Sequence, residues 1–344
     1  MKSWSFLRNA VTLGLAIALL TPPFRPAEAQ APPMSFQSYL QVVAARARSE
    51  GVREGTITQA FAGLTENPRV VALDRQQPGN SNVPPPVAPY LRTHVDAARI
   101  NRGRAAYDQV RGVLPGIERT YGVPGKMMLA IWGHETNYGS YTGDFDLVRS
   151  LATLAYEGRR RQLFEGEFIA VLKMLDRGVP RSRLKGSWAG AFGNPQFLPS
   201  VYLRTAADGD GNGTTDIWNS QADTVASIAN YFRDAGWRTG EPWGVRASVP
   251  AGFSWPGVQS RLNPPTCSRV HERHSGWKSV GEWRRLGVTP LATIRDDTMA
   301  TLFQPDGPGT SAFLLTGNYR VILQYNCSNY YALSVGLLAD EIAR

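Results

Sequence analysis

The sequence has few cysteines, which limits both its metal chemistry and its covalent cross-links. Only Cys267 and Cys327 are present among 344 residues. Two thiolates cannot complete a zinc site built from cysteine alone. In an oxidising compartment an isolated pair more often forms a disulfide than stays as two free thiols, and such a bridge contributes roughly 2–4 kcal/mol to the free energy of unfolding. We therefore expect a Cys267–Cys327 disulfide.

Long hydrophobic runs are absent after residue 29, so no stable membrane anchor is predicted. The apolar run at residues 10–20 is too short to cross a bilayer comfortably. It follows Lys2 and Arg8 and precedes the small residues around Ala29. These are the three regions of a secretory signal peptide, with cleavage expected after Ala29. No cysteine follows the run, which argues against a lipid anchor, and we expect a soluble, exported, periplasmic protein.

Acidic residues are outnumbered by basic ones, 28 to 37, which gives a formal net charge of +9. The predicted signal peptide holds three basic residues and one acidic residue, so the mature chain would carry +7. A basic exported protein suits an anionic polymer such as peptidoglycan, or an anionic membrane surface, whereas nucleic acid is not expected outside the cytoplasm. Because the basic residues are spread along the chain, the charge could equally serve solubility alone.

Several catalytic motifs are missing. The sequence contains no P-loop, no dinucleotide-binding fingerprint and no G-x-S-x-G elbow. The His-Glu-Arg-His segment at residues 271–274 lacks the i, i+4 histidine pair of a helical zinc site, and only His94 and His134 remain elsewhere. Nucleotide-dependent, serine-hydrolase and zinc chemistry are therefore disfavoured.

The spacing of apolar residues predicts a mainly helical chain. Apolar residues three and four apart indicate helices within residues 35–62 and 93–121, with a proline- and asparagine-rich interruption at 78–89. Further helices are predicted at residues 147–154, 164–175, 223–235 and 331–342. Residues 241–320 hold short apolar runs at 243–249, 312–315 and 319–323, which indicate a small β-containing insert. The predicted fold class is α+β, mainly α-helical.

The segment MMLAIWGHETNYG, residues 127–139, places one carboxylate on an apolar helix face. Met127, Ile131 and Glu135 are spaced i, i+4 and i+8, so Glu135 continues the apolar stripe. Desolvation there should raise its pKa, as should the negative end of the helix dipole before a stop expected at Gly139. A general acid working near neutral pH needs such a group. The alternative is a glutamate at a helix end that reaches into water.

Glycoside hydrolysis usually requires a second carboxylate. The sequence offers Asp144 and Asp146, in a segment expected to be a loop. A sugar that supplies its own nucleophile would make a second acid unnecessary, and the sequence leaves both alternatives open.

Residues 186–200, GSWAGAFGNPQFLPS, are rich in glycine, small residues and proline. Small residues let a backbone approach a ligand closely, and Gln196 offers both amide donors and an acceptor. The segment is therefore either a ligand-binding loop or a tight irregular connection packed on the core.

Residues 208–219, DGDGNGTTDIWN, match the first half of a calcium-binding EF-hand loop, but the twelfth position is Asn219 instead of a bidentate glutamate. The pattern is compatible with a structural Ca²⁺, or with an Asp- and Gly-rich turn held by side-chain to backbone hydrogen bonds, and Mg²⁺ suits so flexible a loop less well. The candidate ligands are Asp208, Asp210, Asn212, Thr214 through its carbonyl, Asp216 and Asp223.

Four blocks of the sequence closely resemble the lytic murein transglycosylase B family, glycoside hydrolase family 103. They are residues 132–139, 186–200, 208–218 with 230–231, and 325–340. The resemblance covers about residues 35–344, and the chain departs from the family pattern at Tyr138, at Phe192 and at the pair Asn194-Pro195. It implies a signal peptide (1–29), a helical N-terminal region (30–121), a lysozyme-like catalytic core (122–238), the β-containing insert (239–320), and a motif and helix that close the groove (321–344).

The resemblance further implies cleavage of the β-1,4 bond between N-acetylmuramic acid and N-acetylglucosamine in peptidoglycan, with a 1,6-anhydro product. Glu135 would act first as acid and then as base, without a required cofactor. The residues that match groove positions are Ser187, Gln196, Phe197, Tyr231, Tyr325, Asn326 and Tyr331. Tyr231 and Tyr331 could instead be core aromatics, and Asn326 could cap a turn.

Two other functions stay open on the sequence alone. One is a muramidase that admits water, and the other is a non-catalytic peptidoglycan-binding or scaffold protein. The expected partners are glycan strands and other cell-wall enzymes, without nucleic acid, and the chain is expected to act as a monomer.

Overall fold

The computed structural model describes residues 34–77, 85–261 and 267–343. The predicted signal peptide lies outside these ranges. Within them, no helix combines the length and the apolar character that a membrane span requires.

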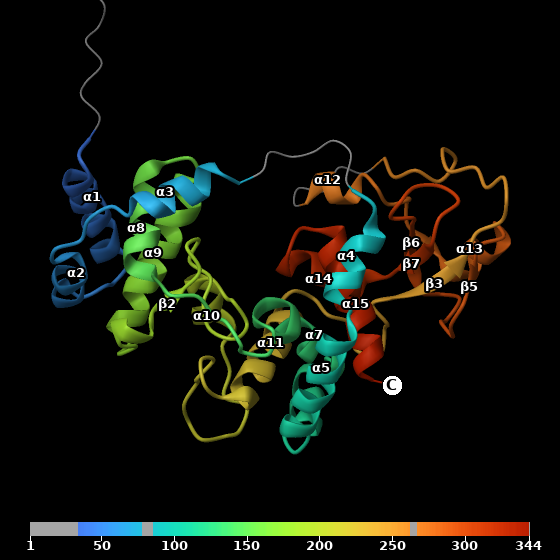
Figure 1. Ribbon diagram of the computed structural model, residues 1–344, viewed down its shortest axis with the longest axis horizontal. Helices are drawn as coiled ribbons and strands as arrows, with labels where there is room; N and C mark the ends of the chain where they lie inside the picture. Colours follow the sequence, from blue (N-terminus) through green and yellow to red (C-terminus); the bar gives the residue numbers. More distant parts are fainter. Residues whose placement is uncertain (1–33, 78–84, 262–266, 344) are drawn as a thin grey trace, which may run out of the picture. The chain divides into compact units, whose positions relative to one another are not determined.

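The described ranges contain fifteen α-helices and seven short strands, which confirms the predicted fold class (Figure 1). The helices are α1 (Phe36–Ser49), α2 (Glu54–Phe61), α3 (Pro68–Arg75), α4 (Val87–His94), α5 (Ala97–Val110), α6 (Leu114–Tyr121), α7 (Gly125–Thr136), α8 (Leu147–Glu157), α9 (Arg161–Asp176), α10 (Pro199–Thr205), α11 (Gln221–Asp234), α12 (Ser268–His271), α13 (Val280–Arg285), α14 (Gly317–Tyr325) and α15 (Asn329–Ile342). The strands are β1 (Phe145–Asp146), β2 (Lys185–Gly186), β3 (Gly244–Ser248), β4 (Lys278–Ser279), β5 (Thr289–Pro290), β6 (Met299–Phe303) and β7 (Ala312–Leu315).

Helices α8 and α9 lie side by side and, with α1 to α3, enclose one hydrophobic core (Figure 1). Asp146 caps α8 by accepting a backbone hydrogen bond at 3.1 Å, and Gly158 ends this helix with a φ of 91°. Phe168 of α9 is fully buried in this core. Phe192 and Phe197 belong to the same core, so the glycine-rich segment at 186–200 is anchored by its own aromatic side chains.

Helix α7 is the centre of a second core. Each residue from Met127 to Trp132 is at most 2% exposed, because α7 packs against α5, α6, α11 and α15 (Figure 1). A helix that is apolar all round is expected to be buried all round. Its first turn is fixed by Glu118, whose Oε1 accepts a hydrogen bond from the Gly125 N–H at 2.6 Å. Glu135 therefore projects from a helix that packing holds in place.

The sheet has its own core. Its antiparallel strands run in the order β4-β6-β7-β3-β5, and all of them fall within residues 239–320. Leu314 of β7 lies between Val245 of β3 and Leu302 of β6 in the register. Trp283 of α13 is buried in the same core, and its Nε1 donates a hydrogen bond to the Ala300 carbonyl at 3.0 Å. Strands β1 and β2 pair separately.

One prediction about secondary structure is corrected by the structure. The run at residues 319–323, predicted within the β-containing insert, lies in helix α14. Tyr319, Ile322 and Leu323 are all buried at the spacing of one helix face, and Thr316 caps this helix with a hydrogen bond of 3.2 Å. The helices predicted within residues 93–121 are α5 and α6, and they are separate because Pro115 has no N–H with which to continue a helix.

The Cys267–Cys327 disulfide is present, which confirms that prediction. The two Cα atoms are 5.6 Å apart, and the bridge joins the start of α12 to the segment that follows α14. His274, in the segment set aside as a zinc motif, is fully buried, with its Nε2 at 2.8 Å from Asn329 Oδ1. Its role in the described structure is therefore internal hydrogen bonding.

Candidate active site

The site is built around the C-terminal turn of α7. The helix ends at Thr136, three residues before the stop expected at Gly139, because Asn137 and Tyr138 both take left-handed backbone conformations with φ of 51° and 59°. Tyr138 then folds back on the helix. A Cβ placed on Gly133 would lie 2.5 Å from the Tyr138 ring, so this glycine makes room for the ring.

Glu135 lies in this last turn with its side chain half-buried. Burial raises the pKa of the Glu135 carboxyl from 4.5 to about 7, which confirms the raised pKa expected from the apolar stripe. The hydroxyl of Tyr331 donates a hydrogen bond to Glu135 Oε1 and opposes this rise. Burial dominates, so a large fraction of the carboxyl is protonated near neutral pH, as a general acid requires.

Aromatic side chains from three segments lie together next to this carboxyl. The ring centroids of Tyr231 and Tyr325 are 4.7 Å apart, and Phe197 lies 5.9 and 6.0 Å from them. The Tyr325 hydroxyl donates a hydrogen bond of 2.5 Å to the Pro195 carbonyl. Burial raises the pKa of the Tyr325 phenol well above 10, and the negative charge of nearby Glu135 raises it further. The structure thus brings Glu135, Tyr331, Tyr325, Tyr231 and Phe197 into one region.

The polar residues of the 186–200 segment hold its irregular backbone. Gln196 has a φ of 50°, and its Nε2 donates to the carbonyls of Thr142 and Gly193 at 3.1 and 2.9 Å. Its Oε1 has no hydrogen-bond partner in the described part of the chain. Ser187 Oγ accepts from the Ala191 N–H at 3.0 Å. The segment is therefore both packed on the core and left with an acceptor for a ligand.

Asn326 directly follows Tyr325 of this group. It is exposed at the end of α14, next to the disulfide, and its backbone N–H donates to Ile322 at 3.3 Å. Its side chain makes no hydrogen bond to any described residue. Among the described residues, the side-chain amide of this predicted groove residue is therefore left without a hydrogen-bond partner.

Sequence reasoning missed one connecting residue, Asn194. Its side chain is 5% exposed, and its Nδ2 donates to Thr224 Oγ1 at 3.2 Å and to the Trp218 carbonyl at 3.4 Å. Its carbonyl accepts from Thr136 Oγ1 at 2.9 Å, directly after Glu135. Asn194 thus ties the end of α7 to α11. The departure from the family pattern at this position was the only signal in the sequence.

The two candidates for a second carboxylate have other positions. Asp146 caps α8 and forms an ion pair with Arg181 at 2.9 Å, and Asp144 is exposed. The pKa of Glu135 is set by burial and by Tyr331, without a contribution from another carboxylate of the described chain. Among the described residues, neither aspartate is therefore paired with Glu135.

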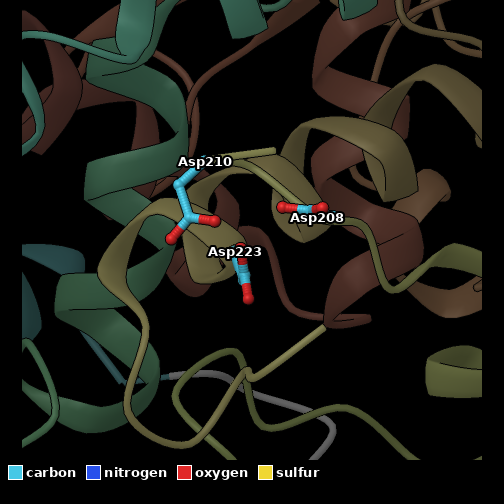
Figure 2. Close-up of side chains that lie close together, drawn as sticks. All are labelled: Asp208, Asp210 and Asp223. Atoms are coloured by element: carbon cyan, nitrogen blue, oxygen red, sulfur yellow. The ribbon is translucent and has the colours of Figure 1, made fainter. Parts of the chain in front are cut away.

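The aspartate-rich loop gathers three carboxylates. Ligand oxygens of Asp208, Asp210 and Asp223 lie within 4.8 Å of one another, and Figure 2 shows the three side chains close together. Asp223 is fully buried in the first turn of α11 and accepts backbone hydrogen bonds from Gly209 at 2.8 Å and Asp216 at 2.7 Å. Carboxylate oxygens are the ligands that Ca²⁺ prefers in proteins.

Asp216, another predicted ligand, lies outside this cluster of carboxylates. Asp216 forms an ion pair with Arg183 at 3.2 Å and accepts from the Asn219 side chain at 3.0 Å, so it is not one of the three gathered carboxylates. Asn212 Oδ1 accepts from the Thr214 N–H at 2.8 Å, as in a turn stabilised by side-chain hydrogen bonds. Of the predicted ligands Asp216 and Asp223, the structure places Asp223 in the cluster, because the start of α11 turns it back toward the loop.

Comparison with known proteins identifies the family of this chain. Residues 35–340 match the family model described as the transglycosylase SLT domain. The chain is also 31% identical over 280 residues to the membrane-bound lytic murein transglycosylase B of Escherichia coli K12, covering 79% of this chain and 73% of that protein. The chain belongs to this family of lytic transglycosylases, which cleave peptidoglycan.

Solved structures agree with this assignment. The transglycosylase matches SltB3 from Pseudomonas aeruginosa in complex with NAG-anhNAM-pentapeptide, with a TM-score of 0.80 and 39% identity over 90% of this chain and 80% of that chain. It matches Slt35 from Escherichia coli in complex with calcium, with a TM-score of 0.71 and 27% identity over 88% of this chain and 91% of that chain. These matches confirm the family resemblance that was inferred from the four sequence blocks. They also confirm the predicted lysozyme-like fold.

Proposed function

We propose that this transglycosylase cleaves the β-1,4 bond between N-acetylmuramic acid and N-acetylglucosamine with Glu135 as its only catalytic carboxyl. The observation that carries the proposal is a half-buried carboxyl with a pKa of about 7 that is hydrogen-bonded to Tyr331 and is not influenced by a second carboxylate of the described residues. An enzyme with one acid needs a substrate that supplies its own nucleophile, because a retaining hydrolase uses a second carboxylate for that step.

The hydrogen bond from Tyr331 assigns roles to the two oxygens of Glu135. Oε1 accepts the phenolic proton, so the carboxyl proton resides on Oε2. Oε2 donates this proton to the glycosidic oxygen as the bond from that oxygen to C1 of the muramic sugar breaks. The C6 hydroxyl of the same sugar then bonds to C1 and gives its proton back to Oε2. The product is a 1,6-anhydro sugar, and no water is consumed.

Burial and the charge of Glu135 keep the pKa of Tyr331 well above 10, so its phenol stays protonated through both steps. The bond from Tyr331 can then stabilise the carboxylate formed after the first proton transfer. This matches the opposing influences on Glu135, since burial favours the acid and Tyr331 favours the anion.

Substrate binding is proposed for the residues around this carboxyl. Tyr231 and Tyr325 offer aromatic faces for sugar rings, and buried Phe197 supports them. Gln196 Oε1 and the Asn326 amide are free to bond acetamido groups, and Ser187 lies half-buried in the same segment as Gln196. SltB3 was solved with NAG-anhNAM-pentapeptide, which supports a groove for glycan strands with peptide substituents.

The test is Glu135→Gln, which keeps an oxygen for Tyr331 but has no acidic proton. It should abolish the release of anhydromuropeptides from purified peptidoglycan, measured by mass spectrometry, while the protein still binds the polymer in a pull-down. Glu165→Gln, in α9, is a matched control that should keep full activity. Reducing-end products from the wild-type protein would favour a muramidase, and binding without any cleavage by wild type would favour a scaffold protein.

We also propose that Asp208, Asp210 and Asp223 hold a structural Ca²⁺. The calcium complex of Slt35 and the all-oxygen donor set support this. Millimolar CaCl2 should raise the melting temperature, more than MgCl2 does, and Asp210→Asn should remove the shift. Asp216→Asn, outside the cluster, is the control that should retain it. A melting temperature that does not respond to Ca²⁺ would contradict the proposal.

Export to the periplasm as a monomer is proposed from the sequence of residues 1–29, the basic charge and the disulfide. N-terminal sequencing of protein recovered from the periplasm should begin after Ala29, and light scattering on a sizing column should give one chain per particle.

A further inference from the structure

His134 precedes Glu135 directly and has no part in the proposed chemistry, yet it is firmly held. Its Nδ1 lies 2.9 Å from the Ala130 carbonyl, and its Nε2 lies 2.7 Å from Ser334 Oγ on α15. Burial lowers the pKa of His134 to about 3, so the ring is neutral. A carbonyl can only accept, so the single ring proton is on Nδ1 and Nε2 is an acceptor for the Ser334 hydroxyl.

The same imidazole contacts Tyr331. The two rings meet edge to face, with centroids 5.6 Å apart and an angle of 74°. Tyr331 and Ser334 are three residues apart on α15, so they share one face of that helix. The Tyr331 carbonyl is a second acceptor for the Ser334 hydroxyl, at 2.8 Å, and because the hydroxyl has one proton it donates either to this carbonyl or to His134 Nε2. His134 thus touches Tyr331 through its ring and holds the next turn of α15 through its nitrogen.

Other groups around His134 oppose a charge on it. His94 of α4 lies 6.1 Å away by ring centroids and stacks on Tyr90 at 3.8 Å. Arg99 of α5 donates to the Gly133 carbonyl at 3.1 Å, and both His94 and Arg99 help to lower the pKa of His134. The titratable or charged groups that face Glu135 and His134 are Tyr90 and His94 from α4, Arg99 from α5, Tyr325 from α14 and Tyr331 from α15.

We propose that His134 is a positioning residue that holds the Tyr331 hydroxyl on Glu135 Oε1 and thereby keeps the catalytic proton on Oε2. The inference rests on the proposed role of Glu135. Glu135, Tyr331, Ser334 and His134 form a closed ring of contacts between α7 and α15. If one of these contacts is lost, the Tyr331 phenol is free to move away from the carboxyl. Glu135 then loses the hydrogen bond that stabilises its anion.

The experiment measures kcat and KM for anhydromuropeptide release as a function of pH. Tyr331→Phe should lower kcat and move the alkaline limb of the profile upward by roughly one pH unit, because a hydrogen bond that stabilises the carboxylate is lost. His134→Leu should move the limb in the same direction with KM unchanged. The double variant should be no worse than Tyr331→Phe alone, since both changes break one contact.

Two further variants keep the test informative if His134→Leu folds poorly. His134→Gln places an oxygen near the position of Nε2 and should restore most of the wild-type profile. Ser334→Ala leaves His134 in place and should also shift the limb upward. An unchanged limb in His134→Leu and Ser334→Ala, or effects that add fully to that of Tyr331→Phe, would overturn the proposal. Activity that survives Glu135→Gln would instead refute the proposed function itself.

Discussion

Replacing Glu135 with glutamine should change stability as well as activity, in a way that depends on pH. The pKa of this carboxyl is about 7 in the folded protein and 4.5 without the protein environment. A carboxyl whose folded pKa is raised binds a proton more tightly in the native state. The favourable contribution of this carboxyl to the free energy of unfolding is therefore complete below pH 4.5, and it is lost as the pH rises through about 7.

The size of the effect follows from the shift. A difference of about 2.5 pKa units corresponds to about 3 kcal/mol, since one unit is about 1.4 kcal/mol. Because the side chain is only half-buried, this figure is an upper bound. A glutamine side chain cannot ionise, so Glu135→Gln does not lose stability in this way as the pH rises. Glu135→Gln should therefore gain up to about 3 kcal/mol over wild type between pH 4.5 and pH 8, or roughly 5 °C in melting temperature for a chain of this length.

The assay is thermal unfolding of both proteins at several pH values, in the same buffer series and at fixed ionic strength. All other titrating groups are common to the two proteins and cancel in the difference. Glu50→Gln is a contrasting control, because a hydrogen bond from Lys173 lowers the pKa of Glu50, so its replacement should lose stability as the pH rises. A Glu135→Gln difference that stays flat with pH would refute the buried, neutral carboxyl.

Three further changes test the surroundings of the site. Tyr325→Phe removes the hydrogen bond to the Pro195 carbonyl and should raise KM severalfold in the cleavage assay, while the pH profile stays in place. Asn194→Ala leaves buried groups of α11 and its preceding loop without a donor and should cost about 1–3 kcal/mol in denaturant unfolding. Replacing Cys267 and Cys327 together with serine should cost about 2–4 kcal/mol in the same measurement, and an unchanged midpoint would contradict the stabilising role of the bridge.

Periodicity was sufficient to predict the part of the site that lies on one helix. Met127, Ile131 and Glu135 share a stripe, and the burial of that stripe explains the raised pKa of the carboxyl. Resemblance to the family supplied Tyr331, whose bond to Glu135 joins residues nearly two hundred positions apart. Spacing within a helix carries no information about such a contact, because it depends on how α7 and α15 pack.

The errors also have physical causes. The run at 319–323 is short and rich in aromatic and branched residues, so its local composition suits a strand, and only burial against α15 and its neighbours selects a helix. Strands β4, β5 and β6 of the sheet were not predicted, because such short strands are selected by their pairing partners in the sheet and not by their own sequence. Asp216 is the ninth position of the EF-hand pattern and Asp223 lies beyond the loop, so the pattern does not predict that Asp223 joins the cluster, where the start of α11 places it. Asn194 bonds to three separate segments, which no local pattern reveals.

The burial of α7 also limits which segments of this enzyme can accept substitutions during evolution. Every side chain from Met127 to Trp132 is buried against neighbouring helices. Almost any substitution there would therefore lower the free energy of unfolding, whatever its effect on catalysis. The proposed groove, by contrast, involves the irregular segment at 186–200 and the junction of α14 and α15, where side chains such as Asn326 are exposed and can be replaced without loss of core packing. New preferences for glycan or peptide should therefore arise in these segments, while the helix that carries the acid stays nearly constant.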